Sequence, residues 1–140
     1  MSKPHTILLD CDDTISTFMA TCIERYNMVF NTNHTIDEIT DWDISDIFNP
    51  PLWDIFEDHD VLQHMPIKEG AFETIKSWHE EGHKIVVVTG VDNVESYADK
   101  IKWLENMGLS EYIYEIIPTK HKELIKGDIF IDDNPAYLYD

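Results

Sequence analysis

The sequence predicts an α/β fold in which a doubly wound parallel sheet carries a small, mostly helical insertion after its first strand. Three observations predict this class. Four short apolar runs are continuous rather than alternating, which is typical of strands buried on both faces. Helical stretches alternate with these runs, and such alternation implies right-handed crossovers between parallel strands. One aromatic-rich segment, residues 16–66, interrupts the alternation directly after the first run.

The predicted strands and helices follow one another in a simple order. The strands cover residues 6–9, 84–88, 112–117 and 128–131. A helix over residues 69–81 places apolar side chains on one face and ends at a glycine: Phe72, Ile75, Trp78, with His79 beside them, and Gly82. A second helix over residues 93–107 has the same design: Val94, Tyr97, Ile101, Leu104, Met107 and then Gly108.

The segment 16–66 is expected to be a cap subdomain within a single domain of residues 1–140, whose core is formed by residues 1–15 and 67–140. Its position after the first strand places it over the carboxyl end of the sheet, where open parallel sheets bind ligands. It could therefore act as a lid. Its large aromatics are Phe18, Tyr26, Phe30, Trp42, Phe48, Trp53 and Phe56. Taken one at a time, such residues more often form the core of a small subdomain than a ligand pocket.

Composition excludes several classes of function. The chain of 140 residues carries 28 acidic and 10 basic residues, a net charge of −18, so its surface repels phosphate backbones and anionic lipids. We therefore expect no nucleic-acid polymer and no membrane as partners. No apolar run approaches the roughly 20 residues of a membrane span, and residues 1–9 are unlike a secretory signal, so we expect a cytoplasmic protein. Cys11 and Cys22 are expected to be reduced and structural.

Two or three carboxylates lie on the turn that leaves the first predicted strand, in the run Asp10-Cys11-Asp12-Asp13-Thr14. Like charges at a few ångströms repel one another, and a hard divalent cation such as Mg²⁺, bound through oxygen, is the usual remedy. The cluster therefore indicates a metal. The alternative is that these acids form only a helix cap and a polar turn.

Three further elements favour the functional interpretation. A second acidic pair, Asp132-Asp133, follows the last predicted strand, and in a doubly wound sheet this strand can be the neighbour of the first. The second strand ends in Thr89-Gly90, where a hydroxyl and backbone N–H groups can receive an anion. After the third strand come Lys120 and Lys122, two of the 10 basic residues. The four elements together predict a site for a metal and an anion.

These four elements in this order resemble the haloacid-dehalogenase (HAD) superfamily. The resemblance implies that Asp10 attacks phosphorus and is transiently phosphorylated, and that Asp12 is the general acid/base. It implies Mg²⁺ bound by Asp10, by the backbone carbonyl of Asp12 and by Asp133, with Asp132 alongside. Haloacid dehalogenases proper lack the second acid of the turn, so Asp12 favours phosphoryl transfer over carbon–halogen cleavage.

The same resemblance assigns the phosphate-binding residues. The hydroxyl of Thr89 and the N–H of Gly90 would hold phosphoryl oxygens, and Lys122 would balance charge on the group as it is transferred. Lys120 lies where relatives can place another basic residue toward phosphate. We therefore expect Thr89, Gly90, Lys120 and Lys122 to surround the phosphate.

Within the superfamily the chain is most similar to the 5′(3′)-deoxyribonucleotidases. Phe18 matches an aromatic that these enzymes place against the nucleobase, and residues 100–108 match their Lys-x-x-Trp helix that ends near Gly. Residues 122–135 match their run of Lys, a short strand, Asp-Asp and Pro. The sequence departs from them in Asp13-Thr14, where relatives have Gly-Val, and in residues 67–71, where relatives have Pro-x-Pro-Gly-Ala. Relatives also continue beyond the residue that matches Asp140.

The resemblance predicts a Mg²⁺-dependent phosphomonoesterase for nucleoside monophosphates. Two alternatives remain: a superfamily phosphatase for another small metabolite such as a sugar phosphate, and a non-catalytic Mg²⁺- or phosphate-binding domain. The base, the sugar and the position of the phosphate stay open, as does a homodimer. The seven histidines are expected at the surface, and only His59 and His64 form even a weak candidate metal pair.

Overall fold

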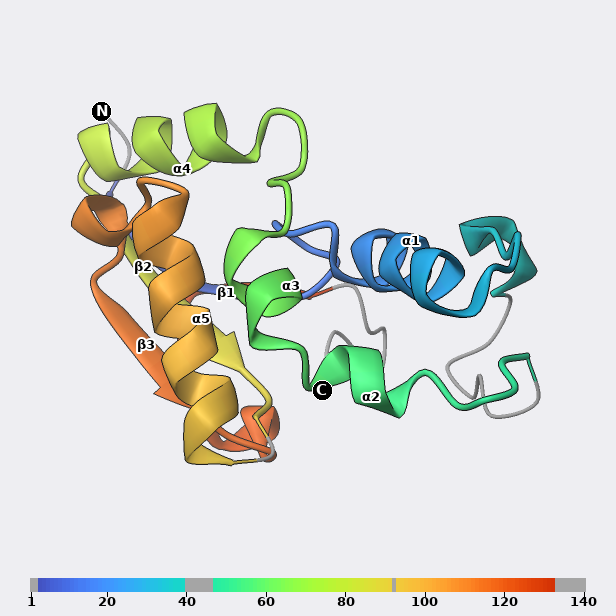
Figure 1. Ribbon diagram of the computed structural model, residues 1–140. Helices are drawn as coiled ribbons and strands as arrows, with labels where there is room; N and C mark the ends of the chain where they lie inside the picture. Colours follow the sequence, from blue (N-terminus) through green and yellow to red (C-terminus); the bar gives the residue numbers. More distant parts are fainter. Residues whose placement is uncertain (1–2, 40–46, 92, 133–140) are drawn as a thin grey trace.

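The parallel sheet predicted from the sequence is present. The computed structural model describes residues 3–39, 47–91 and 93–132, without the side chains of residues 53 and 54. Its sheet has the order β3-β2-β1-β4 and only parallel pairings. The strands are β1 (Thr6–Leu9), β2 (Lys84–Thr89), β3 (Glu115–Pro118) and β4 (Ile129–Ile131). Helices lie between them along the chain (Figure 1), so the α/β class is confirmed.

Strand register brings the ends of β1 and β4 to the same edge of the sheet. Leu9, the last residue of β1, lies opposite Ile131, the last residue of β4. The backbone N–H of Asp10 then donates to the carbonyl of Ile131 at 2.9 Å, which extends the pairing by one step. Residues that follow these two strands therefore leave the sheet side by side.

The path of the chain reverses between β1 and β4. From β1 the chain passes through α4 (Ala71–Glu80) to β2 and through α5 (Val94–Asn106) to β3, moving outward on one side. It then returns to place β4 on the other side of β1. Open α/β sheets bind ligands at such a switch point, outside the carboxyl ends of the strands. The β1–β4 pair marks that point here.

Local sequence explains where the two crossover helices begin and end. α4 lies between Gly70 and Gly82, which have φ of 83° and 93°, a backbone conformation that favours glycine. α5 begins after Asn93, whose side chain accepts the N–H of Ser96 at 2.8 Å, and Gly108, with φ of 73°, follows its end. Both helices match their predicted ranges to within two residues at each end.

The two faces of the sheet carry different clusters. On one face Leu9, Ile85 and Val87 pack with a residue of α4 and two of α5: Ile75, Trp103 and Leu104. On the other face Leu8, Val86 and Val88 form a smaller cluster. Both crossover helices therefore cover the same face, which is expected because the two crossovers run in the same direction across the sheet.

Two sequence predictions need correction. The strand predicted over residues 112–117 is β3 (Glu115–Pro118), preceded by a 3₁₀ turn η2 (Ser110–Tyr112). The turn forms because Tyr112 donates its N–H to the carbonyl of the buried Leu109 at 2.9 Å. The predicted apolar face of α5 is also partly wrong, since Val94 is 79% exposed whereas Asp99 and Lys100 are buried.

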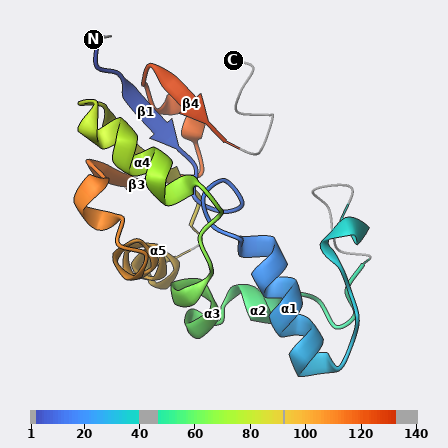
Figure 2. The same ribbon diagram turned by 90° about the horizontal axis from the view of Figure 1, so that it is seen from above.

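A helical segment occupies the chain between β1 and α4. It contains α1 (Phe18–Phe30), the 3₁₀ turn η1 (Ile36–Glu38), α2 (Trp53–Phe56) and α3 (His59–His64). In Figures 1 and 2 α1 and α2 lie beyond the end of the sheet, and α3 lies between them and α5. Its aromatic packing centres on Tyr26, which is buried against Phe30 and Phe48, with ring centroids 4.6 and 5.0 Å away. Trp42 lies outside the described residues, as does the side chain of Trp53.

The two passages of chain into and out of this segment are paired. Ser16 and Ile67 form an antiparallel bridge. The N–H of Thr17 donates to Pro66 at 3.1 Å, and the N–H of Lys68 donates to Ile15 at 2.8 Å. We call this paired region, residues 15–17 and 66–68, the neck. Among the described residues, none of the helices combines the length and apolar character that crossing a membrane requires.

Candidate active site

The acidic turn after β1 is a tight backbone structure. The carbonyl of Cys11 accepts the N–H groups of Thr14, Ile15 and Ser16 at 3.0 to 3.2 Å. Asp13 closes the turn with φ of 60°, in the left-handed region that Asp tolerates better than most residues. The turn presents Asp10 and Asp12 at the switch point of the sheet.

Asp13 helps to cap a helix, which is the alternative that the sequence left open for all the acids of the turn. Its carboxylate accepts the N–H of Met19 at 3.0 Å, and so satisfies a free donor in the first turn of α1. Burial raises the pKa of Asp13, although the Met19 hydrogen bond works in the opposite direction. Its backbone carbonyl accepts a hydrogen bond from Lys68 Nζ at the neck. Asp13 is therefore a structural acid of the turn.

Lys122 joins the ends of β1 and β4. Its Nζ donates to Asp10 Oδ1 and to Asp132 Oδ2, both at 2.8 Å, and all three side chains are buried. The hydroxyl of Thr14 donates to the other oxygen of Asp10 at 3.1 Å. Burial lowers the pKa of Lys122, but the hydrogen bonds to the two carboxylates outweigh it and the net shift is upward. Three residues predicted from separate motifs thus meet, while Asp133 lies outside the described residues.

Asp12 has a different partner. Its Oδ1 accepts a hydrogen bond from Lys100 Nζ, which comes from the middle of α5. The same Nζ lies 5.7 Å from the centroid of the Phe18 ring. The sequence analysis matched Lys100 to the start of a Lys-x-x-Trp helix but gave it no role in the site. The available signal was its position three and four residues before Trp103 and Leu104, which places it on the buried face of the helix.

A cavity of about 110 Å³ lies beside Asp12, between the sheet and the helical segment. Its lining comes from the turn, from the helical segment and from α5 with the loop before it: Asp12, Phe18, Phe56, Leu62, Met65, Gly90, Val91, Ser96, Asp99 and Lys100. Phe18 packs on Phe56 with ring centroids 5.1 Å apart. Phe18 thus lines this cavity. Leu62, Met65 and Ser96 were not predicted, because which face of each element meets the cavity depends on tertiary packing.

The carboxyl end of β2 lies at the same edge of the sheet as the acidic turn after β1. Thr89 is buried, and its carbonyl accepts the N–H of Thr119 at 2.9 Å. Gly90 lines the cavity together with Asp12, and a Cβ at Gly90 would meet nothing closer than the carbonyl of Thr119 at 3.8 Å. Of the two predicted lysines, Lys122 contacts Asp10 and Asp132, and Lys120 is exposed.

The oxygen donors at this edge of the sheet suit a hard cation. Asp10 and Asp132 present carboxylates on either side of the Lys122 ammonium, and Mg²⁺ prefers carboxylate and carbonyl oxygens. Within the described residues, no three His, Cys, Asp or Glu side chains are arranged to hold a metal ion. The Mg²⁺ ligands predicted from the sequence also include the backbone carbonyl of Asp12 and the side chain of Asp133, which lies outside the described residues. The donor chemistry therefore fits Mg²⁺.

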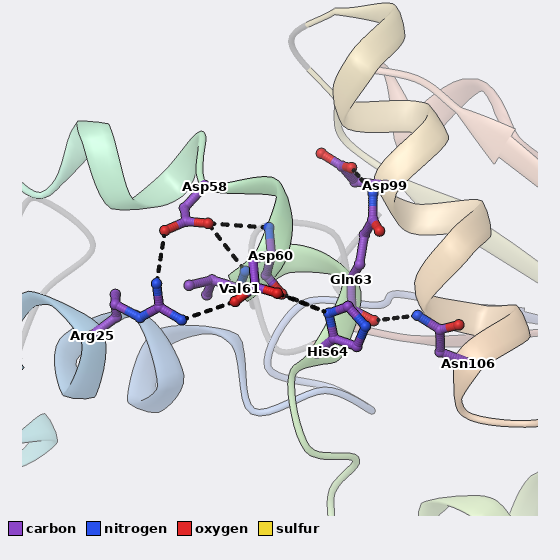
Figure 3. A network of polar contacts seen from close by, with 8 residues as sticks. All are labelled: Arg25, Asp58, Asp60, Val61, Gln63, His64, Asp99 and Asn106. Atoms are coloured by element: carbon purple, nitrogen blue, oxygen red, sulfur yellow. Dashed lines mark hydrogen bonds and ion pairs between the residues drawn. The ribbon is translucent and has the colours of Figure 1, made fainter.

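A polar network fixes α3 between α1 and α5 (Figure 3). Arg25 of α1 pairs with Asp58 at 3.1 Å, and Asp58 caps α3. On the other side the Gln63 amide donates to Asp99 at 2.7 Å, and Asn106 donates to the Gln63 carbonyl at 2.9 Å. These contacts explain why Asp99, rather than Val94, lies on the buried face of α5.

The two histidines singled out in the sequence do not form a pair. His59 contacts Asp99 with its Nδ1 2.6 Å from the carboxylate, whereas His64 contacts the carbonyl of Asp60 at 2.9 Å. Both side chains are largely exposed, as expected. Each therefore serves the packing of α3.

The fold is shared with hydrolases of the HAD type. The structure is similar to that of a hydrolase from Streptococcus pneumoniae TIGR4, with a TM-score of 0.60 and 17% identity over 98% of this chain and 75% of that chain. A HAD-hydrolase from Bacillus subtilis, solved bound to magnesium, matches with a TM-score of 0.56 and 18% identity over 87% of this chain and 66% of that chain. The architecture and the strand-end acids define the class as a HAD-like α/β protein.

The family is defined more narrowly by sequence. The model of the family described as 5′ nucleotidase, deoxy (pyrimidine), cytosolic type C protein matches residues 4–140. A 5′(3′)-deoxyribonucleotidase of Clostridium acetobutylicum is 26% identical over 145 residues, which cover 99% of this chain and 77% of that protein. The chain belongs to this nucleotidase family, as the sequence motifs predicted. It is therefore a hydrolase that acts on phosphoric monoester bonds of nucleotides.

Proposed function

We propose that the chain is a Mg²⁺-dependent 5′(3′)-deoxyribonucleotidase that works through a phosphorylated Asp10. The observation that carries the proposal is that the carboxylates of Asp10 and Asp12 have different hydrogen-bond partners. Asp10 is buried and held by Lys122 and Thr14, whereas Asp12 lines the cavity where a substrate would lie. One carboxylate is thus fixed as a nucleophile and the other is placed to exchange protons with the substrate.

In the first half-reaction an oxygen of Asp10 forms a bond to phosphorus while the bond from phosphorus to the nucleoside oxygen breaks. Asp12 gives its proton to that leaving oxygen. In the second half-reaction Asp12 takes a proton from water, and the resulting hydroxide oxygen attacks phosphorus. The bond to Asp10 breaks and phosphate is released. Asp12 ends protonated, as it began.

Other side chains of this chain hold the phosphate during both steps. The Thr89 hydroxyl and the Gly90 N–H bind phosphoryl oxygens, and the Lys122 ammonium offsets their charge. Bound Mg²⁺ would be held by Asp10, the Asp12 carbonyl, Asp132 and Asp133, and it would reduce the repulsion between nucleophile and phosphate. Lys120, at the surface nearby, would add positive charge on the approach to the site.

We also propose that residues 16–66 form a cap over a core of residues 1–15 and 67–140. The neck supports this division, because the chain enters and leaves the segment through paired backbones. The Phe18–Phe56 wall supports a pocket for a flat nucleobase, since apolar aromatic surfaces commonly bind such rings. The family description as a cytosolic type supports a cytoplasmic location.

Phosphate release from a panel of monophosphates, with Mg²⁺ and with EDTA, tests the proposed function. We expect release from deoxynucleoside monophosphates that EDTA abolishes. Faster release from a sugar phosphate than from any nucleotide would replace the proposed substrate. Release from no compound would favour a non-catalytic binding domain.

Substitution of the nucleophile tests the mechanism. Asp10→Asn should lose turnover by several orders of magnitude, because an amide cannot form the phosphorylated intermediate. Asp37→Asn, the same change at an exposed acid of η1, is the matched control and should keep wild-type activity. Wild-type hydrolysis by Asp10→Asn would remove the mechanism.

A further inference from the structure

Lys100 is a buried cation that none of the four strand-end motifs contains. It lies 88 positions from its partner Asp12 in the sequence, and its side chain is 9% exposed whereas that of Asp12 is 31% exposed. Lys102, two positions later on α5, is instead 54% exposed and pairs only loosely with Glu105 at 3.8 Å. The lysine is the more buried member of this ion pair, and both side chains line the cavity.

The burial of this lysine is costly unless its charge is compensated. The Asp12 carboxylate supplies a counter-charge, and the Phe18 ring lies 5.7 Å from Nζ. The geometry therefore places a charged ammonium between the general acid and one wall of the cavity.

The backbone that carries Lys100 is firmly anchored. On one side Asp99 accepts hydrogen bonds from α3, where Gln63 Nε2 lies 2.7 Å away. On the other side Trp103 is fully buried and donates its indole N–H to the carbonyl of Met65 at 2.8 Å. These two contacts fix the backbone position of Lys100, so its ammonium can hold the Asp12 carboxylate in one place.

Resting on the function proposed above, we propose that Lys100 is a positioning residue for Asp12. Its ammonium binds Oδ1 of Asp12 and turns the carboxylate toward the leaving oxygen of the nucleotide. The proton that moves to that oxygen is then the one on Oδ2 of Asp12, while Lys100 keeps its own protons throughout. Lys122 serves the nucleophile Asp10, and Lys100 serves the acid.

The role of Lys100 can be tested with two substrates that differ in their leaving group. A deoxynucleoside leaves as an alkoxide and needs a proton, whereas p-nitrophenolate leaves without one. The value of kcat/KM reports the steps up to release of the leaving group. Lys100→Met should lower kcat/KM by roughly 100-fold on a deoxynucleoside monophosphate, within the usual range for general-acid catalysis. On p-nitrophenyl phosphate the loss should stay below about threefold.

Three further variants separate positioning from structure. Lys100→Arg keeps the charge and should recover part of kcat, and Lys102→Met is the matched control that should behave like wild type. In an Asp12→Asn background the change Lys100→Met should have no further effect on kcat/KM, because the group that it positions is gone. Should Lys100→Met not fold, Lys100→Gln carries the same comparison.

Other results would overturn the inference. Equal losses on the two substrates would make Lys100 structural, and a higher KM with unchanged kcat would make it a binding residue. A further loss in the Asp12→Asn background would contradict positioning as well. If wild-type protein hydrolysed neither substrate, the proposed function would fail, whatever the behaviour of the Lys100 variants.

Discussion

Lys122 holds together two carboxylates that come from neighbouring strands, and its removal should leave both of them without their shared counter-charge. Because all three side chains are buried, Lys122→Met should lower the free energy of unfolding by about 3–5 kcal/mol in EDTA. Millimolar Mg²⁺ should recover more stability in this variant than in wild type, since a cation can bind the same oxygens. Urea unfolding with and without Mg²⁺ measures both effects.

Lys126→Met is the control for this prediction. Lys126 lies four positions further along the same connection and is exposed, so its loss should change stability by less than about 0.5 kcal/mol. Equal effects of Mg²⁺ on wild type and Lys122→Met would show that the cation does not bind between Asp10 and Asp132.

At the scale of single residues, the strand-end motifs were the predictable part of the site. Asp10, Asp132 and Lys122 meet because parallel strands bring their carboxyl ends to one edge, a rule that needs no side-chain detail. Lys100 was not predictable in the same way. Its partner depends on how α5 is rotated, and that rotation is set by contacts with α3 that sequence periodicity does not reveal.

At the scale of elements, the contact between α3 and α5 contains a titrating pair. The hydrogen bond to Asp99 raises the pKa of His59, and the negative charges of Asp99, Glu95 and Asp58 add to the shift. A raised folded-state pKa means that the stabilisation is fully present below the unfolded value of about 6.5 and is lost as pH rises through the folded value.

His59→Gln should therefore reduce stability more at pH 5.5 than at pH 9. Urea unfolding of both proteins at the two pH values gives the difference. Asp99→Asn is the control background, in which the effect of His59→Gln should depend much less on pH, because the largest cause of the shift is removed. A wild-type advantage that grew with pH would have the wrong sign for this pair.

Gly127, just before β4, lies against β1. A Cβ at this position would meet Leu8 Cγ at 2.6 Å and both of its methyl carbons at 3.0 Å. Leu8 is buried in the cluster with Val86 and Val88 and cannot move away freely, so Gly127→Ala should cost about 1–3 kcal/mol of stability. Thermal or urea unfolding measures it. In a Leu8→Ala background the same change should cost little, and an undiminished cost there would point to backbone strain instead.

Element boundaries were predictable where a residue stops the chain from continuing. Gly82 and Gly108 end α4 and α5 close to the predicted positions, because their positive φ breaks the helical path. The start of β3 was not predictable from its apolar run. Tyr112 and Ile113 are apolar because they pack against the core, yet their backbone N–H groups bond to Leu109 and Ser110 in a turn.

At the scale of the whole molecule, Cys11 and Cys22 report on global unfolding. Both are free and buried, and burial raises the pKa of Cys11 to about 12 and raises that of Cys22 as well. At pH 8 the native protein should react with a thiol reagent only as fast as it opens, because thiolate is the reactive form. Unfolded protein should react at both positions at once.

Reaction rates across a urea series check this prediction. They should rise in parallel with the unfolded fraction measured by circular dichroism. Rapid reaction of one thiol in the absence of urea would contradict burial at that cysteine and would identify a local opening of the turn or of α1.

The overall fold was predictable because alternation, strand-end acids and glycine stops all indicated the same sheet. The role of each aromatic in the helical segment was not. Phe48 is buried with Tyr26 and Phe56 reaches the cavity, although both are aromatic residues in similar polar surroundings. Their roles differ because Phe48, in the loop before α2, packs on Tyr26, whereas Phe56, at the end of α2, packs on Phe18 at the cavity.

The neck has a consequence for how such a protein can change over evolutionary time. Since the chain leaves and re-enters at Ser16 and Ile67, which are already paired, the helices between them can be lengthened, shortened or exchanged without displacing β1. The entropic cost of closing a loop grows only with the logarithm of its length. In the proposed division into cap and core, one insert can be replaced by another while Asp10, the proposed nucleophile, stays in place at the end of β1.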